Sequence, residues 1–435
     1  MRIKGWLAGK VMSRMADLER QRQRELKIEQ QRQPCLHYFH QVNDPYSHLM
    51  AQLIPRLLQQ FSLPCVFHLV PAGADDVVPE RAMLERLARR DAAALAPWYG
   101  LIFVDPGHAP RPDLVTIAEC ILSAQKNPDP DLPRQVGLAL WESDAIGLQA
   151  LAARHGFVDG DARLRKLAQG DQERSKLGYF GSAALYFEGC WYVGIDRLHY
   201  LQRRLLSRGF GKPDEARPTL PNRQSSNAPC NAQNLVLEVF ASLRSPYSYL
   251  AMQRVEDMVR RHGVQVVLRP VLPMVMRGLP VPKRKGTYLM LDAAREAQLL
   301  GLPFGKVFDP LGLPVIRALS LFDWVRSRGQ ELPYYHALLR AAFAEGRDIY
   351  QTGVLKSIIE ALGLNWQEAQ ERLDSHDWEA EVEHNRIELA RHDCWGVPGF
   401  LLRRVGQTKP LCVVWGQDRL WLIEEALQQY AQHAD

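Results

Sequence analysis

Apolar runs and helical periodicities alternate along the chain, and they follow the same order in its two halves. In the second half, an apolar run predicts a strand, and apolar residues at helical spacing predict a helix directly after it. A second strand, a long helical region, a pair of strands and a closing helix follow. The predicted elements are a strand at 235–241, a helix at 246–261, a strand at 264–272, helices over about 288–391, strands at 399–405 and 411–415, and a helix beginning near 415.

The first half predicts the same series of elements in the same order. These are a strand at 35–41, a helix at 45–61, a strand at 64–71, helices over about 79–169, a hairpin at 182–194 and a helix at 194–209. Short motifs recur at matching places, since DPYS (44–47) corresponds to SPYS (245–248) and GIDRL (194–198) to GQDRL (416–420). The pattern indicates duplication of a whole domain, because the repeat is far longer than that of a solenoid.

A segment rich in Pro, Asn, Ser and Gln separates the two halves and has the composition of a linker. The predicted organisation is therefore a basic amphipathic helix at 1–33, a first domain at 34–210, a linker at 211–233 and a second domain at 234–435.

The N-terminal segment places apolar residues at helical spacing over residues 1–18, with Arg and Lys between them. One interpretation is an interfacial helix resting on an anionic membrane, which would make the protein peripheral to the inner membrane surface. The other is a terminal helix that packs on its own domain or frays. A cleaved signal is not expected, because no small-residue cleavage site follows. No stretch of about 18 apolar residues predicts a membrane-spanning helix.

The balance of charges and the spacing of the cysteines argue against a nucleic-acid partner and against a metal site. The 54 Lys and Arg residues are nearly balanced by 49 Asp and Glu residues, so no nucleic-acid partner is expected. The cysteines lack CxxC spacing and, with the 13 His residues, form no zinc-type pattern, so no metal site is predicted. Reduced thiols in a cytoplasmic protein are the expected state. The cysteines are Cys35, Cys65, Cys120, Cys190, Cys230, Cys394 and Cys412.

Five motifs in the second half carry a resemblance to a known family. They are SPYSYL (245–250), RPVL (269–272), GTYLMLDAAREAQLLGLPF (286–304), GVPGF (396–400) and WGQDRL (415–420). In this order the second half resembles the DsbA-like thioredoxin superfamily, within it the branch of 2-hydroxychromene-2-carboxylate isomerases and kappa-class glutathione transferases. The resemblance implies an α/β fold of two tandem thioredoxin-like domains, each with an inserted helical subdomain.

The same resemblance implies an enzyme that uses glutathione as cosubstrate and acts on a small electrophile, as an isomerase or transferase. Ser245 would occupy the place of the first cysteine of a redox CPYC motif, at the N-terminus of a helix that favours a thiolate. It would then stabilise the thiolate of glutathione and would not act as a nucleophile. From the residues alone, Ser followed by Pro is also an ordinary way to begin a helix.

Further candidate residues follow from the resemblance. Val397 and Pro398 would form a cis peptide bond facing Ser245, and the Val397 backbone would pair with the cysteinyl part of glutathione. Gln417 and Asp418 would bind its γ-glutamyl end at the start of the last helix. An acidic residue there is equally suited to ordinary compensation of the helix dipole.

Four more residues complete the candidate set. Tyr247 and Ser248 belong to the same turn as Ser245 and are possible ligand contacts. Lys283 or Arg284 could meet the glycyl carboxylate, or PKRK (282–285) could be a solvated basic loop.

Some positions depart from the family pattern. The loop VMRGLPVP (275–282) lacks the Asn that the resembling enzymes often carry. In the first domain, Asp44 stands where Ser245 stands, and its carboxylate would repel a thiolate. The segment FGSAA (180–184) has no proline at the position of Pro398. The first domain is therefore expected to be a degenerate copy.

Two other functions remain open. A thiol–disulfide oxidoreductase would fit the superfamily, but dithiol exchange needs an attacking and a resolving sulfur, and CxxC is absent. A non-catalytic tandem thioredoxin-like binding module is the second alternative.

Overall fold

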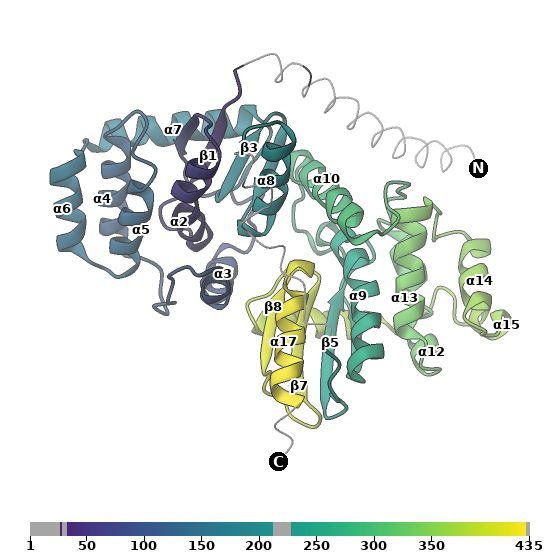
Figure 1. Ribbon diagram of the computed structural model, residues 1–435. Helices are drawn as coiled ribbons and strands as arrows, with labels where there is room; N and C mark the ends of the chain where they lie inside the picture. The colour runs from purple at the N-terminus through teal and green to yellow at the C-terminus, as the bar shows by residue number, and fades with distance from the viewer. Residues whose placement is uncertain (1–26, 28–32, 212–227, 432–435) are drawn as a thin grey trace. The chain divides into compact units, whose positions relative to one another are not determined.

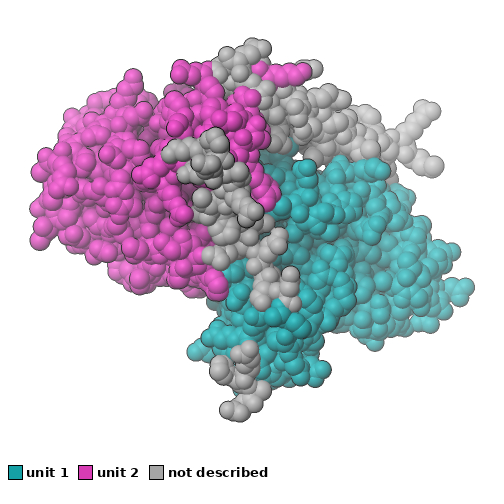
Figure 2. Space-filling view, in the orientation of Figure 1, with its two compact units in different colours: residues 1–20, 223–435 teal, residues 21–222 magenta. Residues whose placement is uncertain are grey.

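The computed structural model describes residues 27, 33–211 and 228–431. Contacts between Cα atoms divide these residues into two compact units, 27 and 33–211 in one and 228–431 in the other (Figure 2). We call them the first and the second domain. The predicted N-terminal helix and most of the predicted linker lie outside the described residues. Within the described residues, none of the helices has the length and apolar character needed to cross a bilayer.

The first domain is built on a four-stranded mixed sheet with the strand order β2-β1-β3-β4. β1 pairs in parallel with β2 and antiparallel with β3, and β3 forms a hairpin with β4. The strands are β1 (Leu36–His40), β2 (Cys65–Leu69), β3 (Ala184–Phe187) and β4 (Cys190–Val193). The helices are α2 (Pro45–Gln60), α3 (Arg81–Leu95), α4 (Pro112–Ser123), α5 (Leu132–Trp141), α6 (Ala145–His155), α7 (Gly160–Lys176) and α8 (Leu198–Ser207), with short 3-10 turns η1 (Ala96–Tyr99) and η2 (Ile195–Arg197).

The second domain repeats this sheet with the order β6-β5-β7-β8 and the same strand directions. Its strands are β5 (Leu235–Ala241), β6 (Gln265–Pro270), β7 (Gly399–Arg404) and β8 (Cys412–Trp415). Its helices are α9 (Pro246–His262), α10 (Lys283–Leu300), α11 (Leu313–Leu319), α12 (Phe322–Arg326), α13 (Glu331–Arg340), α14 (Thr352–Ala361), α15 (Trp366–Gln370), α16 (Glu379–Arg391) and α17 (Leu420–Ala431), with short turns η4 (Met274–Arg277), η5 (Ala341–Glu345) and η6 (Gln417–Arg419).

The two domains thus have one topology, which confirms the predicted pair of thioredoxin-like α/β domains. In each, a strand–helix–strand unit is followed by inserted helices, then a hairpin and a last helix (Figure 1). The register also matches, because Phe39 pairs with Ala184 in the first sheet and Phe240 pairs with Gly399 in the second. The hairpin predicted at 182–194 is present as β3 and β4.

The predicted helical regions differ from the structure at their ends. In the second domain the first inserted helix, α10, begins at Lys283 and not near Tyr288, so the PKRK segment opens a helix and is not a loop. Pro282 precedes this helix in an extended conformation, which suits a residue that cannot donate a backbone hydrogen bond. In the first domain α7 extends to Lys176, past the predicted end near Gln169.

Apolar burial explains why β5 occupies the centre of its sheet. Six of its seven residues are buried, as expected for a strand covered on both faces. Glu238 is the one carboxylate of β5, and both neighbouring strands pair with it, since Arg269 of β6 and Arg403 of β7 each donate to it. Arg403 also donates to Glu388 at 2.6 Å, which ties α16 to the sheet.

Candidate active site

Ser245 begins α9 and lies at its N-cap, with Pro246 as the first helical residue. Its backbone is extended (φ −98°, ψ 114°), and its Oγ accepts a hydrogen bond from the backbone N–H of Ser248 at 3.1 Å. The sequence predicted this helix start. The Ser245 hydroxyl is half-buried and donates to the carbonyl oxygen of Val397 at 3.4 Å, which is a long contact.

The segment that faces Ser245 contains a cis peptide bond between Val397 and Pro398. The Pro398 carbonyl accepts from the N–H of Gly416 at 2.8 Å, and β7 begins at the next residue, Gly399. The fold therefore brings Ser245 and Val397 together although 152 residues separate them. Val397 is half-buried and Pro398 is buried.

Aromatic rings and one buried lysine support this segment. A Cβ added to Gly396 would lie 2.5 Å from the Trp415 ring, so the ring packs directly on the glycine backbone. Trp395 and Trp415 have ring centroids 5.4 Å apart. The Lys285 ammonium lies 5.2 Å from the centroid of the Trp395 ring, and Lys285 itself is buried. Such a cation over an aromatic face is favourable when it is desolvated.

Of the basic residues in PKRK, Lys285 is the one that the structure buries, and sequence reasoning did not single it out. Successive residues of a helix point about 100° apart, so only one of the three basic residues faces the domain. Lys283 is exposed and Arg284 is half-buried in the first turn of α10. The helical pattern of α10, had it been extended to Lys283, would have shown this.

Tyr247 and Ser248 hold the turn in place. The Ser248 side chain is fully buried, and its Oγ accepts from the N–H of Ser242 at 3.3 Å. The Tyr247 hydroxyl donates to the buried carboxylate of Asp292 on α10 at 2.8 Å. Both hydroxyls thus have internal partners in the structure.

Gln417 and Asp418 lie in η6, immediately before α17. The Gln417 side chain is only 1% exposed, and its amide donates to Glu296 at 2.8 Å and to Asp418 at 2.5 Å. The Arg254 guanidinium donates to both the carbonyl oxygen and Oε1 of Gln417, at 2.7 and 3.0 Å. Asp418 is half-buried beside this network.

Arg254 and Glu296 are residues of this site that sequence reasoning missed. Burial lowers the pKa of the Arg254 guanidinium, and the carboxylates of Asp418, Glu424 and Glu296 oppose that shift. A buried guanidinium is tolerated when its donors are satisfied. No local pattern marks these residues, because Arg254 meets Gln417 across 163 positions of sequence.

The corresponding turn of the first domain holds a carboxylate in place of the serine hydroxyl. Asp44 caps α2 and accepts from the backbone N–H groups of Tyr46 and Ser47 and from the Ser47 hydroxyl. Ser182, which aligns with Val397, donates to the same carboxylate at 2.9 Å. Burial raises the pKa of Asp44 despite these four donors. The Asp44 carboxylate is therefore hydrogen-bonded by groups of its own domain.

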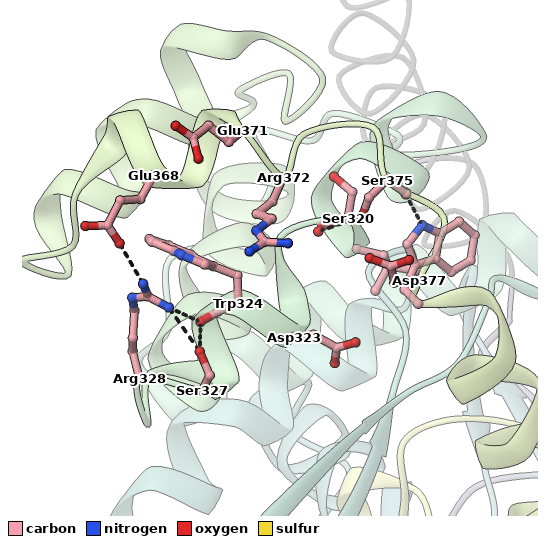
Figure 3. Close-up of a pocket in the computed structure, with 12 residues that line it drawn as sticks. Ser320, Asp323, Trp324, Ser327, Arg328, Glu368, Glu371, Arg372, Ser375 and Asp377 are labelled. Carbon is pink, nitrogen blue, oxygen red and sulfur yellow. Dashed lines mark hydrogen bonds and ion pairs between the residues drawn. The ribbon is translucent and has the colours of Figure 1, made fainter.

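A cavity of about 340 Å³ lies elsewhere in the second domain, among α12, α15 and the segments that follow them (Figure 3). Arg372 points into it, while Arg328 is held by Glu368 at 2.6 Å and stacks over the Trp324 ring. None of the predicted site residues lines this cavity, so it belongs to the helical subdomain and not to the Ser245 site.

Residues 33–211 and 228–431 contain neither a cluster of metal-type ligands nor a disulfide bond. No group of three or more His, Cys, Asp or Glu residues within these ranges is arranged to hold a metal ion. All seven cysteines fall in these ranges, and none of them is joined in a disulfide bond.

Comparisons with known proteins agree with this fold. The family model described as DSBA-like thioredoxin domain matches residues 236–428. A curated relative, 2-hydroxychromene-2-carboxylate isomerase of Pseudomonas putida, is 26% identical over 214 residues, which cover 46% of this chain and 98% of the relative.

The solved structures that are similar to this chain include an isomerase and a disulfide reductase. One is 2-hydroxychromene-2-carboxylate isomerase, at 23% identity and a TM-score of 0.38, covering 45% of this chain and 96% of that one. Another is the cytosolic disulfide reductase DsbM from Pseudomonas aeruginosa with GSH, at 22% identity and a TM-score of 0.35, covering 45% and 99%.

The similarity of this chain to that family rests on the matched model and on the curated relative. The family model covers the second domain alone, while the first domain shares its topology. Residues 236–428, which make up most of the second domain, are thus similar to the DSBA-like thioredoxin domain family.

Proposed function

We propose that the second domain binds glutathione and catalyses a glutathione-dependent isomerisation or transfer, with Ser245 stabilising the glutathione thiolate. The observation that carries this proposal is the position of the Ser245 hydroxyl. It lies at the N-terminus of α9 and points toward Val397, the residue before the cis proline.

For this chemistry, the Ser245 hydroxyl must donate its hydrogen bond to the glutathione thiolate and no longer to the Val397 carbonyl. Its present bond to the Val397 carbonyl is long, at 3.4 Å, so an arriving thiolate is a better acceptor. A hydrogen bond to a charged group contributes about 1.5–3 kcal/mol, and a helix N-terminus contributes about 0.3–1 kcal/mol. At 1.36 kcal/mol per pKa unit, these terms lower a thiol pKa by roughly one to three units. The sulfur then adds to an electrophile, or adds to a double bond and leaves again after the bond has rotated.

The remaining parts of glutathione have candidate partners around this turn. The backbone of Val397 would pair with the cysteinyl residue, and the Asp418 carboxylate would meet the γ-glutamyl ammonium. Because Arg254 and Glu296 already hold the Gln417 side chain, Gln417 would contribute through its backbone at the start of η6. Lys283 or Arg284 would meet the glycyl carboxylate from the first turn of α10.

Dithiol exchange has less support in this turn. Both positions of the motif that would carry sulfur carry oxygen, at Ser245 and Ser248. Ser248 is fully buried and binds the Ser242 backbone, so it takes part in the turn itself. An exchanger needs an attacking and a resolving thiol.

The test is the ultraviolet absorbance of the bound glutathione thiolate, measured against pH in the full-length protein. Wild type should titrate at a pH lower by about one to two units than Ser245→Ala, because the variant loses the hydroxyl but keeps the helix N-terminus. Ser245→Asp is the sharper comparison, because Asp44 shows that Asp caps the same helix start in the first domain. It should preserve folding while it abolishes thiolate stabilisation by charge repulsion.

Two further variants complete the experiment. Ser245→Cys should form a mixed disulfide when treated with oxidised glutathione and release one reduced glutathione, and Asp44→Ala should leave turnover unchanged. Equal titration curves in wild type and Ser245→Ala, or no thermal shift at millimolar glutathione, would favour the non-catalytic binding module.

A further inference from the structure

A second group of reactive side chains lies at the opposite end of α9. Cys230 precedes β5, and its Sγ lies 3.2 Å from Nδ1 of His262, the last residue of the helix. The 17 residues of α9 span about 25 Å, so this pair is remote from Ser245. Cys230 is partly exposed, whereas His262 is only 1% exposed.

Hydrogen bonding defines the proton positions on the imidazole. The backbone N–H of Cys230 donates to Nδ1 of His262 at 3.2 Å. Nδ1 is therefore an acceptor, and neutral His262 carries its proton on Nε2. The thiol of Cys230 faces the same acceptor nitrogen and can transfer its proton there.

A carboxylate stands behind the imidazole. The Oε1 atom of Glu424 on α17 lies 3.8 Å from Nε2, and Glu424 is fully buried. Neither Nε2 of His262 nor Oε2 of Glu424 has a hydrogen-bond partner within the described part of the chain. When His262 accepts a proton, its charge forms beside this carboxylate, which also receives a hydrogen bond from Arg261.

The resting pair is neutral. Burial, together with the charge of Glu424, raises the pKa of the Cys230 thiol, and burial together with Arg261 lowers the pKa of His262. A thiol of this kind is not a preformed thiolate and becomes nucleophilic when a neighbouring base removes its proton. A nucleophile, a base and a group that supports the base occur here in the order that activated nucleophiles require.

We propose that Cys230 is a modification site that reacts with small disulfides, with His262 as the base and Glu424 as the group that supports it. His262 Nδ1 takes the thiol proton while Sγ attacks one sulfur of the small disulfide. The S–S bond of the reagent breaks, and its second sulfur leaves as a thiolate. The imidazolium returns the proton to this thiolate. The products are a mixed disulfide on Cys230 and one free small thiol, so no other oxidant or reductant is needed.

The adduct would also disturb the segment that enters β5. Ala232 is fully buried, and its N–H donates to the His262 carbonyl at 2.7 Å, two residues after Cys230. A bulky substituent on Sγ competes for the space between Cys230 and the imidazole. We therefore expect the modified second domain to unfold at a lower temperature than the reduced one.

The experiment treats the full-length protein with oxidised glutathione and follows each cysteine by peptide mass spectrometry. Cys412 of β8 is also partly exposed and serves as the internal control in the same domain. Cys230 should be modified about tenfold or more faster than Cys412, a lower bound that a general base exceeds when it is fully effective. His262→Gln retains an acceptor for the Cys230 backbone but is no base, and it should reduce the rate to that of Cys412.

Two further measurements test the proposal even if the His262→Gln variant fails to fold. They are the modification rate of Cys230 in Glu424→Gln and the pH dependence of that rate in the wild type. Glu424→Gln should slow modification several-fold, and the wild-type rate should fall as His262 becomes protonated at low pH. Equal rates at Cys230 and Cys412, or an unchanged Cys230 rate in both variants, would overturn the proposal.

Discussion

The hydroxyl of Tyr247 donates to the buried carboxylate of Asp292 at 2.8 Å, and Tyr46 makes the same bond to Asp91 at the same distance. Each pair joins the first turn of the motif helix to the next long helix of its domain, α10 in the second and α3 in the first. Tyr247 and Asp292 each stand 201 positions after their counterparts in the first domain, Tyr46 and Asp91. The duplication thus preserves this contact although the neighbouring Ser245 and Asp44 differ.

Tyr247→Phe should destabilise the second domain by about 1–3 kcal/mol, because the buried Asp292 oxygen loses its donor. Hydrogen exchange of the amides in α9 and α10 measures this free energy in one domain at a time. The matched variant Tyr46→Phe should loosen α2 and α3 by a similar amount and leave α9 and α10 unchanged. A loss below about 0.5 kcal/mol in both variants would show that the tyrosine hydroxyls are not important for packing.

Arg254→Met should destabilise the second domain by about 3–5 kcal/mol, because it leaves Gln417 and Glu296 buried without their cation. We also expect weaker glutathione binding, since η6 loses the contact that positions Gln417. The control is Arg260→Met on the same helix, where the arginine side chain is 64% exposed and pairs with Asp257. That variant should change stability by less than about 1 kcal/mol. Chemical denaturation and calorimetric titration measure the two effects, and equal behaviour of the variants would contradict the prediction.

Gly170→Ala should disrupt the packing of α7 on the first sheet. A Cβ at this position would lie 2.0 Å from the carbonyl oxygen of Leu69, which is backbone and cannot turn away. Overpacking of this kind costs about 1–3 kcal/mol. Gly160 begins the same helix with open space around it, so Gly160→Ala should be neutral or slightly stabilising. Urea denaturation measures the free energy of unfolding of the two variants. The prediction is wrong if both variants have wild-type stability.

The first domain should lose stability as the pH falls from about 6.5 to about 5. Burial lowers the pKa of His40 to about 3 and the pKa values of His48 and His68 to about 4. In this window the unfolded chain binds protons that the folded chain does not, so the free energy of unfolding rises with pH and falls on acidification. Each histidine contributes up to about 1.4 kcal/mol per pH unit.

Hydrogen exchange of α2 amides at several pH values measures this slope. His68→Phe removes one of the three groups while it keeps a ring to stack on Phe39. The variant should reduce the slope by about one third. A slope equal to that of the wild type would show that His68 is not buried in its neutral form.

Much of the fold could be predicted because its signals are local. The strand β5 follows from a run that is apolar except at Glu238, and α9 follows from a Ser–Pro start and apolar residues at helical spacing. The order of elements, repeated in both halves, was enough to predict two thioredoxin-like domains. Element ends were less certain: the start of α10 was placed too late, because basic residues in its first turn have the composition of a loop.

The candidate site was predictable in part. The sequence by itself determined that oxygens replace both sulfurs of the motif, that a proline follows Val397, and that the first domain carries Asp44 instead. These statements concern which chemical groups the chain carries, and composition and order are sufficient to make them.

Only the tertiary structure decided which groups meet. The Arg254–Gln417 contact, the Ser182–Asp44 bond and the Cys230–His262 pair join residues 163, 138 and 32 positions apart. Their formation depends on how helices pack on the sheet, and no local periodicity records that packing. Burial makes these contacts matter for pKa values and stability. A charge or lone pair that is removed from water is stabilised only by the few partners that remain next to it.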